Sequence, residues 1–340
     1  MTMQEQVLAL LDQVLVPGVM RSLVALNLVD RVQVSEGQVD VTLASAALSG
    51  DAQEWLRERV RGTVQGLAGV RESRVEFVDA KPKDRNQVGQ VVAVMSGKGG
   101  VGKSLVSALI AVSLARQGQE VGVLDADITG PSIPMLFGLH GHPFGSETGM
   151  LPVLTRAGIE VMSLNLLLPN VDDAVIWRGP LIGNAIKQFW EDVLWGRLDY
   201  LIVDLPPGTA DAPLTVMQSL PVSGVVIVFS PQELAAMVVR KAVQMTRKMD
   251  VPILGVVENM SYLQLDDGRR LEIFGKSKAE EMAQAAGAPL LAQLPLDPDL
   301  ARLCDEGRIE EYDSPAVASL RDGLVEALSR GEPAHLQSHD

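Results

Sequence analysis

The stretch Gly97-Lys98-Gly99-Gly100-Val101-Gly102-Lys103-Ser104 decides the fold of this 340-residue chain. It has the spacing G-x-x-x-x-G-K-[ST], it follows the apolar run 91–95, and a helical pattern begins at Lys103. The glycines allow successive backbone N–H groups to face a phosphate, and the start of the helix adds free N–H groups and a positive dipole end. The stretch therefore predicts a phosphate-binding loop. A glycine-rich turn with an accidental lysine and serine is the alternative.

This spacing also assigns chemical roles to individual side chains. Lys103 is placed to reach the β- and γ-phosphates of a nucleotide, and the hydroxyl of Ser104 is placed to ligate Mg²⁺. The residues that we expect to bind ATP in the loop are Gly97, Lys98, Gly99, Gly100, Val101, Gly102, Lys103, Ser104 and Leu105.

Outward from the loop, short β-branched runs alternate with helical patterns. Most runs are continuously apolar, as in parallel strands that are covered on both faces. This alternation predicts an α/β domain with a doubly wound, mostly parallel sheet. The predicted strands are 91–95, 121–124, 159–162, 201–203, 225–229, 253–257 and 290–294, and the helices include 103–117, 181–195, 233–248 and 314–330.

The first 79 residues have the pattern of a small α+β domain. Helical spacing from Gln4 to Val14, a hairpin around residues 35–38, a helix from Asp51 and a strand from Arg74 to Val78 are predicted there. The next stretch is charged and aperiodic, which indicates a linker more than a surface loop. We therefore expect four parts, with boundaries at 1–79 (small domain), 80–90 (linker), 91–330 (nucleotide domain) and 331–340 (tail).

Carboxylates follow two of the predicted strands. Asp125 and Asp127 end the run 121–124, and Asp204 ends the run 201–203 before Leu-Pro-Pro-Gly-Thr. Side chains at the carboxyl ends of parallel strands point into the ligand crevice, where carboxylates can hold metal-bound water and orient an attacking water. We expect Asp204 to hold Mg²⁺ through water and Asp127 with Asp125 to act in catalysis. A solvated pair at a strand end is the alternative for Asp125 and Asp127.

Asn259 follows the run 253–257, and its amide offers both a donor and an acceptor to an adenine edge. The alternative is an Asn that caps the next turn. In the turn after Asp204, the two prolines and Gly208 are expected to leave a backbone N–H free to sense the γ-phosphate.

Composition excludes several classes of function. The net charge is −14, and Lys and Arg gather in no patch, which argues against nucleic-acid binding. The single cysteine, Cys304, fits a reducing cytoplasm, and no apolar run is long enough to cross a bilayer. We therefore expect a cytoplasmic protein with no nucleic-acid or membrane partner.

Lys98 is not required by an ordinary phosphate loop. The sequence K-G-G-x-G-K-[ST] resembles the deviant Walker A class, the superfamily of MinD, ParA and the nitrogenase iron protein. The resemblance implies an ATPase that works as a homodimer, in which Lys98 reaches the phosphates held by the facing subunit. It also implies that Asp127 activates water and that Asn259 contacts the base. A solvated loop lysine is the alternative for Lys98.

Four further stretches, at 127–134, 177–180, 187–200 and 258–261, resemble the Mrp/ApbC branch of iron–sulfur cluster carrier ATPases. Residues 1–79 resemble the small domain appended to bacterial Mrp proteins, which is related to cluster-assembly factors. The resemblance implies a role in iron–sulfur cluster assembly or transfer. It implies ATP, Mg²⁺ and a 4Fe–4S cluster as bound groups, and iron–sulfur assembly or client proteins as partners.

The chain departs from that family at three places. Leu105 replaces a hydroxyl residue and Thr129 replaces a tyrosine. The third departure is the absence of a C-P-x-C pair after Ser261, where Asp266 and Asp267 stand instead. Cluster iron is normally held by Cys thiolates, so Cys304 is the remaining, weak candidate ligand. Among the histidines, His140 and His142 form a weak candidate metal pair.

Two other functions fit parts of the sequence. A MinD- or ParA-like positioning ATPase would need an amphipathic basic helix, but the last predicted helix carries Asp322 and Glu326. A scaffold that binds nucleotide with little turnover would fit Leu105, whereas the aspartates and the two loop lysines favour hydrolysis.

Overall fold

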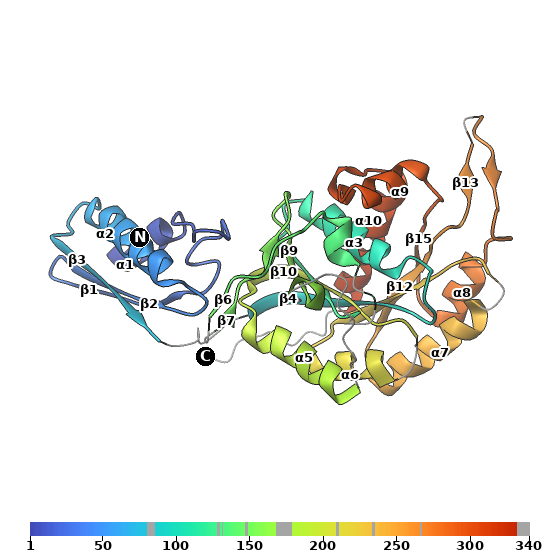
Figure 1. Ribbon diagram of the computed structural model, residues 1–340, viewed down its shortest axis with the longest axis horizontal. Coiled ribbons are helices and arrows are strands. Elements are labelled where there is room, and N and C mark those ends of the chain that lie inside the picture. Colours follow the sequence, from blue (N-terminus) through green and yellow to red (C-terminus); the bar gives the residue numbers. More distant parts are fainter. Residues whose placement is uncertain are drawn as a thin grey trace. The chain divides into compact units, whose positions relative to one another are not determined.

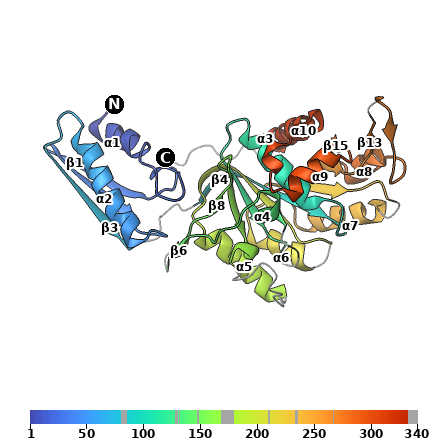
Figure 2. The same cartoon turned by 45° about the horizontal axis from the view of Figure 1, so that its top comes forward.

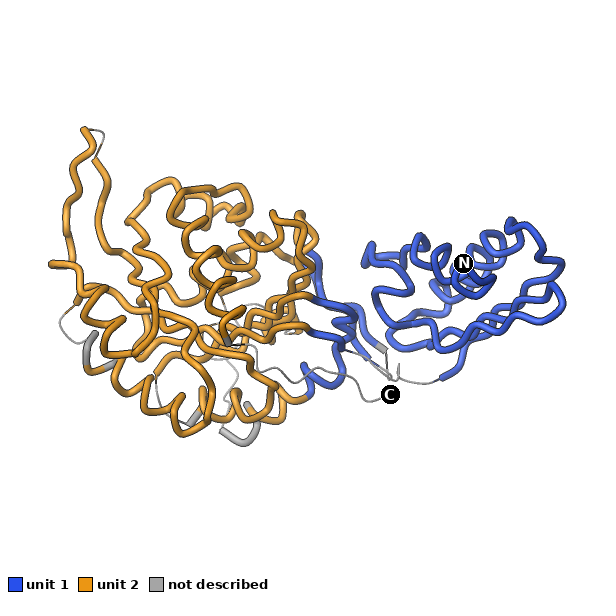
Figure 3. Tube along the Cα trace, turned by 180° about the vertical axis from the view of Figure 1, so that it is seen from behind, with its two compact units in different colours: residues 1–88, 141–154, 188–198 blue, residues 89–140, 155–187, 199–340 orange. Residues whose placement is uncertain are grey.

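The structure is a computed structural model that describes residues 1–79, 86–127, 130, 132–146, 149–167, 179–208, 211–232, 235–265 and 267–331. The predictions about Thr129, Asp266 and the tail from residue 332 lie outside these residues. The chain divides into two compact units, which Figure 3 colours separately. Unit 1 comprises residues 1–88, 141–154 and 188–198, and unit 2 comprises 89–140, 155–187 and 199–340. The four-part division of the sequence stays a prediction.

The N-terminal part of unit 1 has a three-stranded sheet in the order β1-β2-β3. β1 (Val29–Ser35) and β2 (Gln38–Ala44) are antiparallel, and β3 (Glu72–Val78) runs parallel to β2. The turn between β1 and β2 has Glu36 at φ 47° and Gly37 at φ 85°. Two consecutive left-handed residues are typical of a tight two-residue hairpin turn, so the predicted hairpin is confirmed with longer strands.

Two helices accompany this sheet. α1 (Met3–Leu11) begins with a capping box between Thr2 and Glu5, and α2 (Gly50–Gln65) is capped by Ser49. The predicted extension of the first helix to Val14 is wrong, because α1 ends at Leu11. Val14 is nevertheless buried, and its backbone N–H donates to Leu11 O. The helical spacing of apolar residues thus continues into a buried turn.

The large sheet has the order β15-β12-β11-β4-β10-β5-β9-β8, and the pairs β11–β4, β11–β12, β12–β15, β10–β5 and β5–β9 are parallel. The predicted doubly wound, mostly parallel sheet is confirmed. Its strands are β4 (Asn86–Ser96), β5 (Val121–Asp125), β8 (Val153–Leu154), β9 (Glu160–Ser163), β10 (Gly196–Asp204), β11 (Gly224–Phe229), β12 (Ile253–Glu258) and β15 (Leu290–Gln293).

Helices cover this sheet on two faces. Figures 1 and 2 both show α3 and α10 on one face and α6 and α7 on the other, and Figure 1 shows α9 with the first pair and α8 beside α7. The bounds are α3 (Lys103–Ala115), α4 (Ile133–Leu136), α5 (Gly179–Asp192), α6 (Asp211–Ser219), α7 (Ala235–Lys248), α8 (Ala279–Ala286), α9 (Pro298–Asp305) and α10 (Pro315–Gly331). Within the described residues, no helix is long and apolar enough to cross a membrane.

Several elements were not predicted. They include two small hairpins, β6 (Gly145–Ser146) with β7 (Gly149–Met150) and β13 (Leu263–Gln264) with β14 (Arg270–Leu271). Strands of two residues carry no readable periodicity. The predicted helix 181–195 ends at Asp192, because Trp195 leaves the helical path and its backbone N–H donates to Asn86 Oδ1 at 3.1 Å.

Candidate functional site

The predicted site residues gather at the carboxyl edge of the large sheet. The phosphate loop follows β4, Asp125 ends β5, Asp204 ends β10 and Asn259 follows β12. The register of β5 and β10 pairs Asp204 directly with Asp125. Ligands bind at this edge in open α/β sheets, because the strands end there on either side of a crevice.

Lys103 is the centre of charge in the site. Its side chain is 6% exposed, and its Nζ lies 2.7 Å from Asp204 Oδ2 and 3.6 Å from Asp127 Oδ2. A buried ammonium is stable only when it is paired, and these two carboxylates pair it. The structure therefore holds the lysine at the start of α3 in reach of both strand ends, where a phosphate could replace a carboxylate contact.

Two hydroxyls on α3 hold the carboxylate of Asp204. Ser104 Oγ donates to Asp204 Oδ2 at 2.5 Å, and Ser107 Oγ donates to Oδ1 at 2.7 Å. Ser107 was not named from the sequence. Its spacing of three residues from Ser104, on the same side of a helix, was the available signal.

Burial raises the pKa of Asp125 well above its ordinary value, with Asp204 and Asp127 adding to the rise and Lys103 opposing it. Burial likewise raises the pKa of Asp204, against the opposing effects of Lys103, Ser104 and Ser107. One ammonium thus faces three carboxylates. A divalent cation in this crevice would favour the ionised carboxylates.

Asp125 anchors the segment that carries Asp127. Its Oδ1 accepts from the backbone N–H of Asp127 at 3.2 Å. Its Oδ2 accepts from Ile133 N–H at 3.3 Å and from Ser163 Oγ at 3.1 Å. Asp125 is 1% exposed and Asp127 is 8% exposed, so Asp127 is the more accessible of the two carboxylates. These contacts fit a positioning role for Asp125.

Asn259 packs directly on the phosphate loop. Its Nδ2 donates to Val101 O at 2.9 Å, and its side chain is 2% exposed. Gly102 lies beneath it with φ 80°, and a Cβ at Gly102 would stand 2.1 Å from Asn259 Nδ2. Only glycine fits at this position. The contact between Asn259 and the loop therefore depends on the glycine at position 102.

Lys98 turns to Gln232, whose Oε1 accepts a hydrogen bond from Lys98 Nζ. The backbone around Lys98 is held by Ser96, whose Oγ donates to Lys98 O at 3.0 Å. The turn after β10 differs from the expectation of a free N–H, because Gly208 N–H donates to Ser96 O at 2.9 Å. To reach a γ-phosphate, this N–H must first leave the Ser96 carbonyl.

The oxygen donors of the site fit Mg²⁺. Hydroxyl and carboxylate oxygens suit this hard cation, which is usually bound by one or two carboxylates together with substrate phosphates and water. Ser104 Oγ and Asp204 Oδ2, 2.5 Å apart, are the atoms that would hold it. When bound, Mg²⁺ neutralises charge on the phosphates.

His140, His142 and Cys304 belong to no metal-binding group of the described residues. Among the described residues, which include His140, His142 and Cys304, no three or more His, Cys, Asp or Glu side chains are grouped to hold a metal ion. Cys304 lies half-buried on α9, and burial together with Asp305 raises the pKa of its thiol to about 11. The thiolate that cluster iron requires is therefore disfavoured at Cys304.

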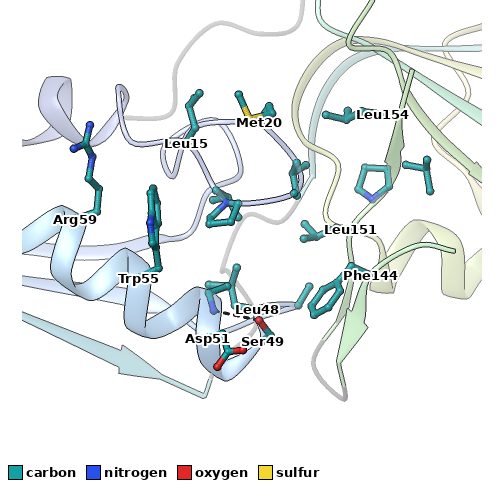
Figure 4. Close-up of a pocket in the computed structure, with 18 of the residues that line it drawn as sticks. Leu15, Met20, Leu48, Ser49, Asp51, Trp55, Arg59, Phe144, Leu151 and Leu154 are labelled. Atoms are coloured by element: carbon teal, nitrogen blue, oxygen red, sulfur yellow. Dashed lines mark hydrogen bonds between the residues drawn. The ribbon is translucent and has the colours of Figure 1, made fainter. Parts of the chain in front are cut away.

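Unit 1 contains a separate pocket of about 1000 Å³. Figure 4 shows its lining, which includes the apolar side chains of Leu15, Met20, Trp55 and Phe144. Each of these four is more than a third exposed. The residues assigned to the phosphate site do not line it.

Two protein families match this sequence. Residues 87–327 match the family described as NUBPL iron-transfer P-loop NTPase. The chain belongs to this family. Residues 4–77 match a second family, described as iron-sulfur cluster assembly protein. The matches confirm the resemblance seen in the sequence for both the N-terminal and the nucleotide-binding parts of the chain.

Full-length relatives support this family membership. A protein of Synechocystis sp. named iron-sulfur cluster carrier protein is 39% identical over 331 residues, which cover 93% of this chain and 94% of the relative. A protein of the same name from Deinococcus radiodurans is 40% identical over 331 residues, covering 94% and 93%.

Solved structures resemble the nucleotide domain. A nucleotide-binding protein from Archaeoglobus fulgidus, in complex with ADP, is 50% identical, with a TM-score of 0.61 over 68% of this chain and 91% of that chain. The cell division ATPase MinD of Pyrococcus furiosus is 21% identical, with a TM-score of 0.52 over 71% and 99%, a likeness that shows the fold alone. A MinD- or ParA-like positioning function is therefore less well supported than a function of the iron-transfer family.

Proposed function

We propose that this chain is an ATP-hydrolysing dimeric switch that acts in iron–sulfur cluster assembly or transfer. The observation that carries the proposal is the cluster of Lys103, Ser104, Asp127 and Asp204 at one sheet edge, with Lys103 Nζ within 4 Å of both carboxylates. The relatives that match over nearly the whole chain are named iron-sulfur cluster carrier proteins.

In the proposed reaction, Lys103 and the loop amides hold the phosphates of ATP while Ser104 and Asp204 hold Mg²⁺. Asp127, the more exposed of the two carboxylates, orients the attacking water, and Asp125 positions Asp127 through its backbone N–H. Lys98 leaves Gln232 and reaches the phosphates in the facing subunit. Asn259 contacts the adenine. Such a switch would alternate between closed and open dimers.

The cargo is an iron–sulfur cluster, and the described side chains of this chain do not supply enough ligands for it. Cys304 has a raised pKa and offers one thiol per subunit, whereas a 4Fe–4S cluster takes four ligands. We propose that a partner or a small thiol completes the ligand set. We further propose a cytoplasmic location and assembly or client proteins, with no nucleic-acid or membrane partner.

The switch is tested by Asp127→Asn, which keeps the size of the side chain and removes its charge. We expect this variant to bind Mg·ATP, hydrolyse it slowly and sediment as a dimer, because the closed state lasts longer. Asp322→Asn on α10 is the control. A variant that fails to bind ATP would instead make Asp127 a structural residue.

The cluster role is tested by activating an apo iron–sulfur enzyme from a preformed cluster donor. Adding the chain with Mg·ATP should speed activation, and Lys103→Ala should not. No stimulation by the wild-type chain would contradict the role in transfer while leaving the ATPase intact.

A further inference from the structure

Glu258 is a buried carboxylate that the nucleotide chemistry does not use. It ends β12 and is 0% exposed. Its Oε2 accepts from Ser261 Oγ at 2.6 Å, from Ser277 Oγ at 2.7 Å and from Gln293 Nε2 at 2.9 Å. Its Oε1 accepts from Lys278 N–H at 2.7 Å. Four donors compensate the cost of burying this group, so its network is a fixed point of the local structure.

The partners of Glu258 stand at both ends of one protruding segment. Ser261 directly precedes residues 262–276, and Ser277 with Lys278 directly follows them. Within this segment, which we call the hairpin arm, β13 pairs with β14 and the Arg270 guanidinium stacks 4.1 Å above the Tyr262 ring. Figure 1 shows β13 extending away from the large sheet. Glu258 therefore closes the base of the hairpin arm.

The neighbouring residue makes the contact with the phosphate loop. Asn259 donates from its side chain to Val101 O at 2.9 Å and from its backbone N–H to Phe229 O at 2.8 Å. Glu258 and Asn259 share a rigid peptide unit, and both side chains are buried. A displacement of the Val101 carbonyl thus reaches the base of the hairpin arm through two adjacent residues.

The contacts run from Val101 through Asn259 and Glu258 to the hairpin arm, and the arm is exposed to binding partners. Leu271, Ile273 and Phe274 are 45%, 54% and 38% exposed. A change in the order of the arm changes how this apolar surface is presented. Glu258 bonds to residues on both sides of the arm, and so it ties the two ends of the arm together.

We propose that Glu258 is a positioning residue that makes the order of the hairpin arm depend on the nucleotide in the phosphate loop. This inference rests on the proposed nucleotide site. Nucleotide fixes the loop carbonyl that Asn259 contacts, Glu258 holds the adjacent backbone, and the arm becomes more ordered as a result. A physical coupling of this kind needs no contact between the arm and the nucleotide.

The experiment is hydrogen exchange of peptides from 262–276 in the full chain, with and without Mg·ADP. ADP isolates occupancy of the site from turnover. In the wild type, ADP should slow exchange in the arm. In Glu258→Gln, one carboxylate oxygen becomes an NH₂ that faces a donor, so the ADP-dependent slowing should be lost while ADP still binds by calorimetry.

Glu272→Gln, an exposed carboxylate within the arm, is the matched control and should keep the wild-type response. If Glu258→Gln does not fold, Ser277→Ala removes one donor and should weaken the response. Wild-type exchange that ADP leaves unchanged, despite bound ADP, would overturn the inference. So would an unchanged response in the folded Glu258 variant. A wild-type chain that binds no ADP would instead overturn the proposed function on which the inference rests.

Discussion

At the scale of single residues, the phosphate loop contains two glycines whose backbone is left-handed, a conformation that other residues adopt only at a cost. Gly102 has φ 80° and lies under Asn259, whereas Gly100 has φ 79° and no atom within 4 Å of the position that a Cβ would take. Both glycines have a left-handed backbone, but only Gly102 lies against the Asn259 side chain. Substituting each of them in turn therefore separates the effect of backbone strain from the effect of crowding.

Gly102→Ala should destabilise the protein more than Gly100→Ala does. Both substitutions place a Cβ on a left-handed residue, at a cost of about 1–3 kcal/mol. Gly102→Ala also pushes Asn259 away, which should lower the free energy of unfolding by roughly another 1–3 kcal/mol. Denaturant unfolding without nucleotide measures both. Equal effects would mean that the contact with Asn259 contributes nothing.

Cys304 should be an unreactive thiol at neutral pH. Its pKa is raised to about 11, so the neutral thiol dominates at every pH below that value. At pH 8 the thiolate fraction is on the order of one in a thousand, against roughly a quarter for an ordinary cysteine. Iodoacetamide should therefore react with Cys304 about a hundredfold more slowly than it reacts with the thiol of glutathione. The rate of labelling at Cys304 should increase as the pH rises. Labelling at the rate of glutathione would refute the burial argument.

At the scale of elements, α3 links the phosphate loop to the buried carboxylate of Asp204. Ser104 and Ser107 lie one helical turn apart and hold the two oxygens of Asp204. Ser113 lies further along the same helix, and its Oγ donates to Ile110 O at 2.8 Å. Both Ser107 and Ser113 are buried, so they form a matched pair.

Ser107→Ala should weaken both stability and Mg·ADP binding. It leaves one oxygen of the buried Asp204 short of a donor, which costs about 1–3 kcal/mol. Ser113→Ala should cost less, because a backbone carbonyl in a helix keeps its own hydrogen bond. Thermal unfolding and calorimetry of the two variants provide the comparison. Similar losses in both would show that the Asp204 contact is dispensable.

The elements also show what the sequence could predict. The continuously apolar strands β5, β11 and β12 and the helix after the loop were predicted because burial on both faces leaves a readable pattern. The hairpin arm and Ser107 were not, since two-residue strands have no period and a lone serine in an apolar helix has many uses. The Glu258 network joins residues up to 35 positions apart, and such contacts arise from folding.

At the scale of the whole molecule, the chain combines an intact phosphate site with a single thiol. Reconstitution with iron and sulfide under anaerobic conditions, followed by desalting, should leave little bound metal and no broad absorbance near about 400 nm from thiolate-ligated iron. Cys304→Ser should behave as the wild type does. A stoichiometric cluster that survives desalting and disappears in Cys304→Ser would make Cys304 a ligand.

In the proposed dimer, two subunits complete one ATPase site through Lys98. This arrangement is tested by phosphate release from a 1:1 mixture of Lys98→Ala and Lys103→Ala subunits. Each variant alone should be inactive. Half of the dimers in the mixture are mixed, and each of these keeps one site with Lys103 from one subunit and Lys98 from the other. The mixture should therefore show about a quarter of wild-type turnover, because of this symmetry. A mixture as inactive as its components would contradict it, because Lys98 would then act only within its own subunit.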